Sequence, residues 1–108
     1  MKRCEMIKDK ERFNLIIKTG KYSKDGNFVV YYLDNPSNKY THFGIALKNS
    51  LGNAVVRNRI KRQTRALVDN NKKLFKNSRD YIIMIRKGCL ESSFDEMNKS
   101  LINIMKGM

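Results

Sequence analysis

The stretch from Gly52 to Arg62, which reads GNAVVRNRIKR, joins a turn to a run of closely spaced cations. We predict that Gly52-Asn53 ends one structural unit and that a long helix runs from Ala54 to about Phe75. Within that range one side of the helix is apolar, at about 100° per residue; it consists of Val56, Ile60, Leu67 and Leu74. Because strands are predicted before and after this helix, the chain belongs to the α/β class.

Cations occupy the remaining sides of this helix. Arg57, Lys61 and Arg65 are spaced by four residues and form one strip. A rigid strip of cations matches a phosphate backbone, which arginine bonds bidentately, and Asn58 suits a base edge or a ribose. The alternative is a solvated charged face, but such faces usually mix signs, and no acid occurs here before Asp69. The predicted RNA-binding residues are Arg57, Asn58, Arg59, Lys61, Arg62, Arg65 and Lys72, the last extending the strip by two turns.

The composition agrees with a polyanionic partner. The chain has 108 residues, which fits one domain over residues 1–108, and its net charge is +13. A surplus of this size indicates nucleic acid or an anionic membrane surface. Compositional drift is the alternative, but four of the eight arginines lie between Arg57 and Arg65, and no acid lies between Asn35 and Val68. Drift explains scattered lysines better than it explains clustered arginines.

The cysteines and the N-terminus indicate where the protein works. Cys4 and Cys89 are far apart and show no metal-binding or redox spacing, so we expect a reducing compartment and no disulfide. The charges from Asp9 to Arg12 interrupt any signal peptide, and no stretch has the apolar length of a membrane span. We predict a cytoplasmic protein.

The remaining elements surround the long helix. We predict a short first helix that Asp9 caps and Gly20 ends, with Ile7, Phe13, Ile16 and Ile17 on one face. Strands are predicted at Phe28–Leu33 and Thr41–Leu47, and the turn signal between them, residues 34–38, predicts a hairpin.

The C-terminal part adds one strand and one helix. The apolar run Tyr81–Ile85 predicts a buried strand. We expect this strand to pair in the same sheet, where it could lie parallel to an earlier strand. Ser93 and Glu96 match a capping box and begin a last helix. Its buried side consists of Phe94, Met97, Leu101, Ile104 and Met105.

One face of the predicted sheet is a second candidate for RNA contact. Alternation places Tyr31 on the face opposite Phe28, and the matching residues of the next strand, His42, Gly44 and Ala46, are small or polar. Such a face would be open, Tyr31 could stack on an unpaired base, and Phe13 could wall one side. Ordinary core packing is the competing explanation for both aromatics, and the residues alone favour it.

No catalytic constellation can be named. His42 is the only histidine and has no cysteine, histidine, serine or acid at a useful spacing. The acidic pairs Asp9 with Glu11 and Asp95 with Glu96 lie at helix starts, where capping explains them. The sequence therefore indicates a binding protein rather than a self-sufficient nuclease, and the flanking strands speak against a helix-turn-helix.

The Arg57-Asn58-Arg59 segment followed by Lys61-Arg62 closely resembles the signature of the bacterial ribonuclease P protein family. The resemblance covers almost the whole chain. It includes Phe13, Lys18, Gly20, Phe28-Val29-Val30-Tyr31, Leu33-Asp34, Asp80-Tyr81-Ile82-Ile83 and Arg86-Lys87. A ribosomal or general RNA-binding protein without enzymatic role is the alternative, and the Gly52–Arg62 string separates it from this family.

The resemblance implies a fold and a division of labour. The fold would be a single-domain α-β sandwich with three helices and a four-stranded sheet, like the second domain of a small-subunit ribosomal protein, with a left-handed β-α-β crossover. The protein would be the subunit of ribonuclease P that assists removal of the 5′ leader from precursor tRNA. Its partners would be the RNA subunit and the leader, with no membrane and no obligate protein partner. Mg²⁺ would be held mainly by the RNA, and no protein side chain would be catalytic.

The family's leader cleft can be carried over residue by residue. It falls on Phe13, Ile17, Tyr31, Gly44, Ala46 and Lys48, with Lys61 and Arg65 toward the leader side. The chain departs from the family pattern in three places. Ile17 replaces a usual aromatic, Asn49-Ser50 replaces Lys-Lys, and Gly26 stands where arginine is common.

Overall fold

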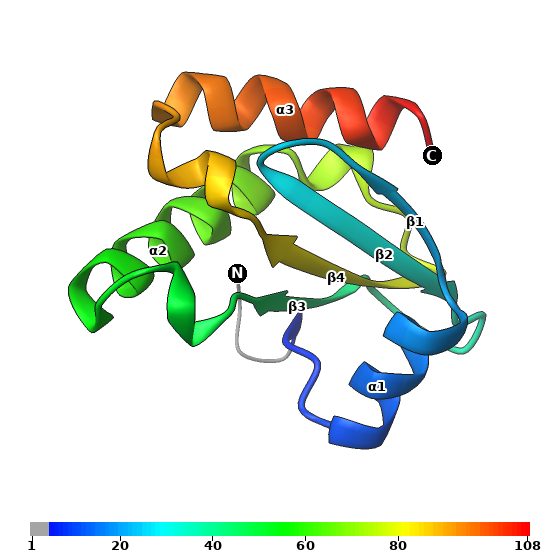
Figure 1. Cartoon of the computed structure of the whole chain (residues 1–108). Helices are drawn as coiled ribbons and strands as arrows, with labels where there is room; N and C mark the ends of the chain where they lie inside the picture. The colour runs from blue at the N-terminus through cyan, green and yellow to red at the C-terminus, as the bar shows by residue number, and fades with distance from the viewer. Residues whose placement is uncertain (1–4) are drawn as a thin grey trace.

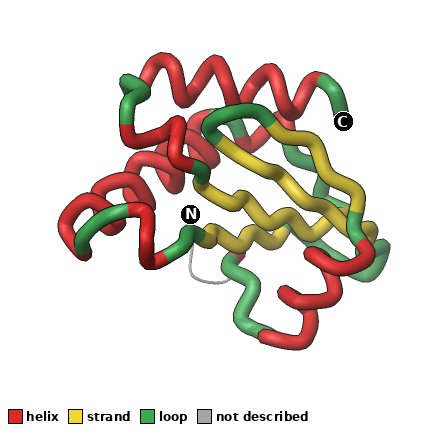
Figure 2. Tube along the Cα trace, in the orientation of Figure 1, coloured by secondary structure: helices red, strands yellow, loops and turns green. Residues whose placement is uncertain are grey.

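The structure is a computed structural model that describes residues 5–108. The helices are α1 (Lys10–Thr19), α2 (Ala54–Asn70) and α3 (Phe94–Lys106), and the strands are β1 (Lys21–Lys24), β2 (Phe28–Asp34), β3 (His42–Ala46) and β4 (Arg79–Ile85). Three short 3-10 helices lie between these elements: η2 (Asn49–Leu51), η3 (Lys72–Leu74) and η4 (Lys87–Leu90). α2 and α3 lie along one side of the sheet, and α1 lies apart from them (Figures 1 and 2).

The four strands form one mixed sheet in the order β1-β2-β4-β3. β1 and β4 are both antiparallel to β2, and β3 is parallel to β4. The parallel pairing of the 81–85 strand with an earlier strand is thus confirmed, as is an α/β fold with three helices and a four-stranded sheet. The left-handed sense of the β3–α2–β4 crossover stays a prediction.

The hairpin between β2 and β3 was predicted wrongly, because β4 lies between these two strands. The turn at residues 34–38 exists but is fastened to β4. Asn35 Nδ2 and Asn38 Nδ2 donate hydrogen bonds of 3.2 and 2.7 Å to the Asp80 carboxylate at the start of β4. The turn therefore leads the chain past β4 instead of folding it back beside β2.

Asp80 joins three parts of the fold. Its side chain is buried, and besides the two asparagines it accepts a 2.8 Å hydrogen bond from Arg12 Nε of α1. Burial by itself would raise the pKa of this carboxyl group. The hydrogen bonds from Asn38, Arg12 and Asn35 outweigh that effect, so the pKa lies below its usual value.

Side-chain caps explain where the helices begin. Asp9 accepts from the Glu11 amide at α1, Asn53 from the Val56 amide at α2, and Ser93 and Glu96 form both bonds of a capping box at α3. The caps at Asp9 and Ser93 are therefore confirmed.

α2 ends at Asn70, five residues before the predicted end. Asn71 Nδ2 donates a 2.8 Å hydrogen bond to the Leu67 carbonyl. This bond satisfies one of the carbonyl groups in the last turn of the helix. The chain then continues as η3, and Leu74 is exposed instead of lying on the apolar side of the helix.

Gly20 ends α1 as expected, but not as a left-handed residue, because its φ is −71°. Its role comes from a close approach of backbones. A Cβ atom at this position would lie 2.4 Å from the Ile16 carbonyl oxygen and 2.6 Å from that of Tyr32. Glycine lets the chain leave α1 and enter β1 directly beside β2.

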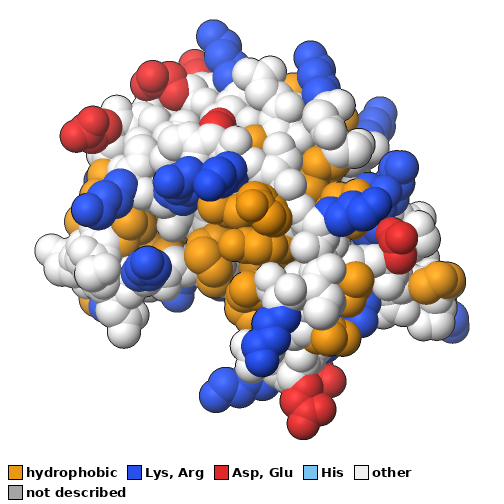
Figure 3. Space-filling model, turned by 45° about the vertical axis from the view of Figure 1, so that its right-hand side comes forward, with side chains coloured by type: hydrophobic (Ala, Val, Ile, Leu, Met, Phe, Trp, Pro, Cys, Tyr) orange, Lys and Arg blue, Asp and Glu red, His pale blue; other side chains and the backbone are white. Residues whose placement is uncertain are grey.

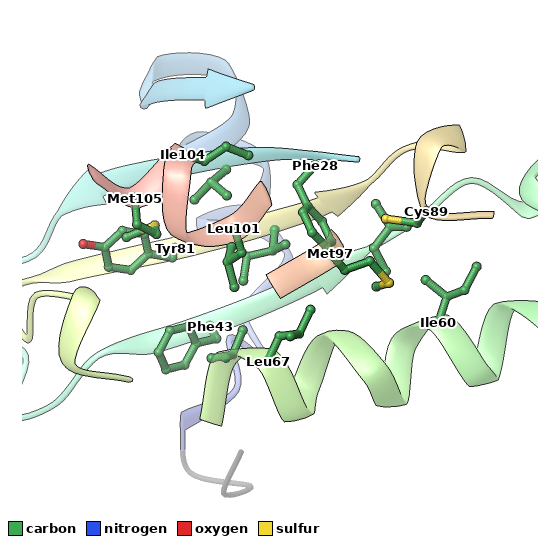
Figure 4. Close-up of a cluster of buried hydrophobic side chains, with 14 of the residues drawn as sticks. Phe28, Phe43, Ile60, Leu67, Tyr81, Cys89, Met97, Leu101, Ile104 and Met105 are labelled. Carbon is green, nitrogen blue, oxygen red and sulfur yellow. The ribbon is translucent and has the colours of Figure 1, made fainter. Parts of the chain in front are cut away.

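The main core lies between the sheet and the two longer helices. Phe28, Phe43 and Tyr81 from the strands face Leu67 of α2 and Leu101 of α3 (Figure 4). The opposite side of the sheet, called the open face below, carries the alternate residues of each strand. These are Val29, Tyr31 and Leu33 of β2, Asp80, Ile82 and Met84 of β4, and His42, Gly44 and Ala46 of β3.

Cys89 lies in the main core and should be chemically inert in the folded protein. Its thiol donates to the Asn27 carbonyl, and burial raises its pKa to about 12. Since the thiolate is the reactive species, a rise from the ordinary value lowers its population at pH 8 by about 10³-fold. Because Cys4 lies outside the described residues, a Cys4→Ser variant gives the clean measurement. We expect iodoacetamide to label it slowly in native buffer and fast in concentrated guanidinium. Rapid labelling under native conditions would contradict the burial.

Candidate nucleic-acid interface

The outer side of α2 presents cations to solvent, as predicted. Arg59, Arg62 and Arg65 are exposed together with Asn58, whereas Ile60 on the same helix is fully buried. Lys61 is half-buried. A helix whose apolar side is fixed in the core holds these guanidinium groups on a rigid surface suited to phosphates.

Arg57 is the cation that differs from this group. It is half-buried, and its Nη1 donates a 2.6 Å hydrogen bond to Asn49 Oδ1 of η2. Its Nε is buried and has no hydrogen-bond partner among residues 5–108. Arg57 therefore connects α2 to the segment after β3. Asn49 stands where the family commonly has lysine, and lysine could not accept this hydrogen bond.

Lys72 does not extend the strip, contrary to prediction. It lies in η3 beyond the end of α2, and its Nζ donates to both Glu5 carboxylate oxygens at 2.7 and 2.9 Å. Asp69 Oδ1 is 3.7 Å away. The hydrogen bond to Glu5 raises the pKa of this ammonium group, which is a structural ion pair in the described chain. The sequence could not reveal this pair because its partner is 67 positions away.

α1 covers one part of the open face. A Cβ atom on Gly44 would lie 3.0 Å from Phe13 Cε2, so the phenyl ring rests directly on the backbone of β3. Gly44 is consequently buried beneath Phe13, while Phe13 and Ile17 themselves are half-buried. Phe13 walls the face, as predicted, and Gly44 provides the space for it rather than an exposed floor.

Tyr31 lies on the same face, with Ile82 between it and Gly44. It is half-buried, so it is neither a fully exposed stacking surface nor a fully buried core residue. Its ring centroid lies 5.6 Å from that of Tyr22 on β1, at an interplanar angle of 43°. Apolar side chains gather in the middle of one face of the molecule, with lysine and arginine side chains around them (Figure 3). An apolar surface bordered by cations suits an unpaired nucleotide, which has both a base and a phosphate.

A pocket of about 230 Å³ adjoins the open face. Val29 and Met84, which belong to that face, form part of its apolar lining, and Lys48, Arg86 and Lys87 line it with cations. Ala46 is the neighbour of Met84 on β3 and is half-buried. Among these residues only Ala46 and Lys48 were predicted from the sequence to belong to the leader cleft. Met84, Arg86 and Lys87 are brought in by the order of the strands.

Comparison with known proteins identifies the family. Residues 1–108 match the family Ribonuclease P. The ribonuclease P protein component of Bacillus cereus is 38% identical over 106 residues, which cover 98% of this chain and 92% of that protein. The chain belongs to the ribonuclease P protein family.

Solved structures of this family share the fold. The RNase P protein of Staphylococcus aureus superposes with a TM-score of 0.85 at 30% identity, covering 94% of this chain and 93% of that one. The RNase P protein of Thermotoga maritima gives a TM-score of 0.85 at 30% identity, covering 96% and 97%. Membership of the ribonuclease P protein family thus rests on sequence and on structure.

In this member of the ribonuclease P protein family, His42 has an acid beside it, contrary to the prediction that none could be named. Its Nδ1 lies 3.4 Å from Asp80 Oδ1. The pair could not be predicted from the sequence because Asp80 belongs to β4, which is parallel to β3 but distant from it along the chain. The carboxylate is buried and already accepts hydrogen bonds from Arg12, Asn35 and Asn38. This arrangement is that of a structural anchor.

Within residues 5–108 no three histidine, cysteine, aspartate or glutamate side chains come together as a possible metal site. Over the same range no helix has the length and apolar character needed to cross a membrane.

Proposed function

We propose that the chain binds the RNA subunit of ribonuclease P through the exposed side of α2, and the single-stranded 5′ leader of precursor tRNA through the open face. Membership of the family makes the chain a protein component of an endoribonuclease that processes tRNA 5′ ends. The observation that carries the finer proposal is the bond between Arg57 and Asn49. This hydrogen bond connects α2 to the segment after β3. Lys48 and Ser50 of that segment line the pocket beside the open face.

The two surfaces suit two kinds of RNA. Exposed arginines on a rigid helix match the regularly spaced phosphates of a folded RNA. The open face combines Phe13, Tyr31 and an apolar pocket with cations, which suits bases that are not paired. A leader that leaves the docked RNA beside α2 would therefore enter the pocket side of the face first.

We place catalysis and Mg²⁺ on the RNA subunit and its substrate. Two buried acids of the described residues are already engaged by cations, Asp80 by Arg12 and Glu5 by Lys72. The contribution of the chain would be its charge of +13, which offsets repulsion between phosphates. We also propose a cytoplasmic location and no obligate protein partner.

The first test uses the protein without RNA. We expect purified protein to cleave no precursor tRNA with any divalent ion, and to lower the Mg²⁺ requirement of the cognate RNA subunit when added to it. Cleavage rates are measured across a Mg²⁺ titration with and without protein. Robust cleavage by RNA-free protein that His42→Ala abolishes would overturn the proposal. Sequencing the RNA that co-immunoprecipitates with the protein tests the alternative of a general RNA-binding protein. That alternative predicts many different bound RNAs, whereas the proposed function predicts one dominant structured RNA.

Tyr31→Ala is expected to weaken binding of precursor tRNA by the assembled holoenzyme about 5- to 20-fold, while binding of mature tRNA stays nearly unchanged. The reason is that base–aromatic stacking is worth about 1–3 kcal/mol, and only the precursor has an unpaired leader. The lower part of that range applies, since Ile17 adds no aromatic face. Affinities for both tRNAs are measured at saturating RNA subunit.

Tyr31→Phe serves as the matched control, because it keeps the ring. It should bind both tRNAs as the unaltered protein does. Equal losses on precursor and mature tRNA for Tyr31→Ala would show that Tyr31 is a packing residue and that the leader does not lie on it.

A further inference from the structure

One row of paired residues crosses all four strands on the open face. Tyr22 of β1 pairs with Tyr31 of β2, Tyr31 with Ile82 of β4, and Ile82 with Gly44 of β3. Phe13 rests on the Gly44 end of this row. Since neighbouring strands lie about 4.8 Å apart, the row is about 14 Å long, with Phe13 at one end and Tyr22 at the other.

Tyr22 is the most exposed aromatic of this row. Its exposed fraction is 59%, and it lies on an edge strand beyond Tyr31. The sequence analysis missed it because Lys21–Lys24 is short and polar, and was not predicted as a strand. Its ring is tilted by 43° against that of Tyr31, and the exposed fraction shows that most of the Tyr22 surface stays open to solvent.

Lys24 accompanies Tyr22 on the same face. It lies two residues further along β1, opposite Val29, which lines the pocket. Its side chain is exposed and forms no ion pair with any residue from 5 to 108. An aromatic ring and an unpaired ammonium at neighbouring positions of one face match the base and the phosphate of one nucleotide.

The direction of the leader follows from the position of α2. This helix packs against β3, which is the edge strand of the sheet farthest from β1. If RNA docks on α2, as proposed above, a leader would meet the β3 edge of the face first and β1 last. A short leader ends before Tyr22, whereas a long one crosses it.

We propose that β1 is a further contact strip for the 5′ leader, in which Tyr22 stacks on a base beyond the one at Tyr31 and Lys24 binds the adjoining phosphate. The inference rests on the proposed function, since it requires the leader to lie on the open face. It adds that β1 contributes to affinity only when the leader is long enough to reach this edge strand.

The test combines three variants with two substrates. Tyr22→Thr removes the ring but keeps a residue suited to strands, and Tyr22→Phe keeps the ring. The substrates are precursor tRNAs with unstructured leaders, one too short to pass Tyr31 and one long enough to cross the sheet. We expect Tyr22→Thr to weaken holoenzyme binding of the long-leader substrate about 5-fold and to leave the short-leader substrate unchanged. Tyr22→Phe should behave as the unaltered protein, and Lys24→Gln should reduce the salt dependence for the long leader by roughly one unit.

Each other outcome has a definite meaning. An equal loss on short and long leaders would show that Tyr22 only supports Tyr31, and the inference would be wrong. No loss on either leader, while Tyr31→Ala still distinguishes precursor from mature tRNA, would also refute it and would leave the proposed function standing. If Tyr31→Ala distinguishes nothing either, the proposed function and the inference both fail.

Discussion

Asp80→Ala should destabilise the folded protein by about 3 kcal/mol, since breaking a buried charge pair by removing one partner typically costs about 3–5 kcal/mol. The lower end applies because Arg12, the charged partner, is partly exposed. Asn35 and Asn38 would lose their acceptor in the same step, so the 34–38 turn would detach from β4. Urea denaturation followed by circular dichroism measures the free energy of unfolding.

Asp34→Ala is the matched control for this measurement. Asp34 pairs with Arg79 at 3.2 Å, but 72% of its side chain is exposed. Exposed pairs contribute about 0–1 kcal/mol. If the two variants lost equal stability, the buried hydrogen bonds of Asp80 would not be the anchor described above.

The same carboxylate predicts a loss of stability in acid. The folded-state pKa of Asp80 is lowered, so the folded state favours the ionised form more than the unfolded chain does. Its contribution is complete above the unfolded-state pKa of about 3.9 and is lost as the pH falls through the lower folded-state pKa. Asp80→Asn should therefore show a smaller fall in stability between about pH 5 and pH 2 than the unaltered protein. Parallel pH curves for the two proteins would refute this assignment.

Replacing Arg59, Arg62 and Arg65 together by Gln should reduce affinity for the RNA subunit by about 10²- to 10³-fold at ~0.1 M salt. Each phosphate contact contributes roughly 0.7–0.9 to the slope of log affinity against log salt, so the slope should become flatter by two to three units. All three side chains are exposed, so the fold should tolerate the change. Arg57 is left out because its bond to Asn49 would confuse binding with stability.

A control variant removes the same charge elsewhere. Lys76, Lys99 and Lys106 are exposed and lie outside α2. Changing them to Gln lowers the net charge by the same three units but should alter the salt slope far less. Equal slopes for both triple variants would mean that the total charge, and not the surface of α2, determines RNA binding.

Local signals in the sequence located the elements whose causes are local. The caps at Asp9 and Ser93 and the apolar run of β4 each depend on residues a few positions apart. The exposed arginines of α2 were found for the same reason, since helical spacing determines which side they occupy.

The errors share a different cause, because they depend on residues distant in sequence. A turn signal at residues 34–38 cannot reveal that β4 occupies the place beside β2. The pairing of Lys72 with Glu5, and that of His42 with Asp80, likewise join distant segments. β1 gave no signal of its own, because four largely polar residues form a strand only where β2 offers them an edge.

The position of β4 also has a consequence for synthesis on the ribosome. β4 is one of the two inner strands of the sheet, yet it emerges after β2, β3 and α2. Until Arg79–Ile85 has been made, β2 and β3 have no common neighbour, and the apolar residues Phe28 and Val30 of the nascent chain have no complete core to enter. Contacts between such distant segments are slow to form and leave strand edges exposed in the meantime. The nascent protein therefore completes its sheet, and with it the proposed RNA-binding surfaces, only after β4 has been made. A ribosome that stalls before β4 holds a chain prone to aggregation.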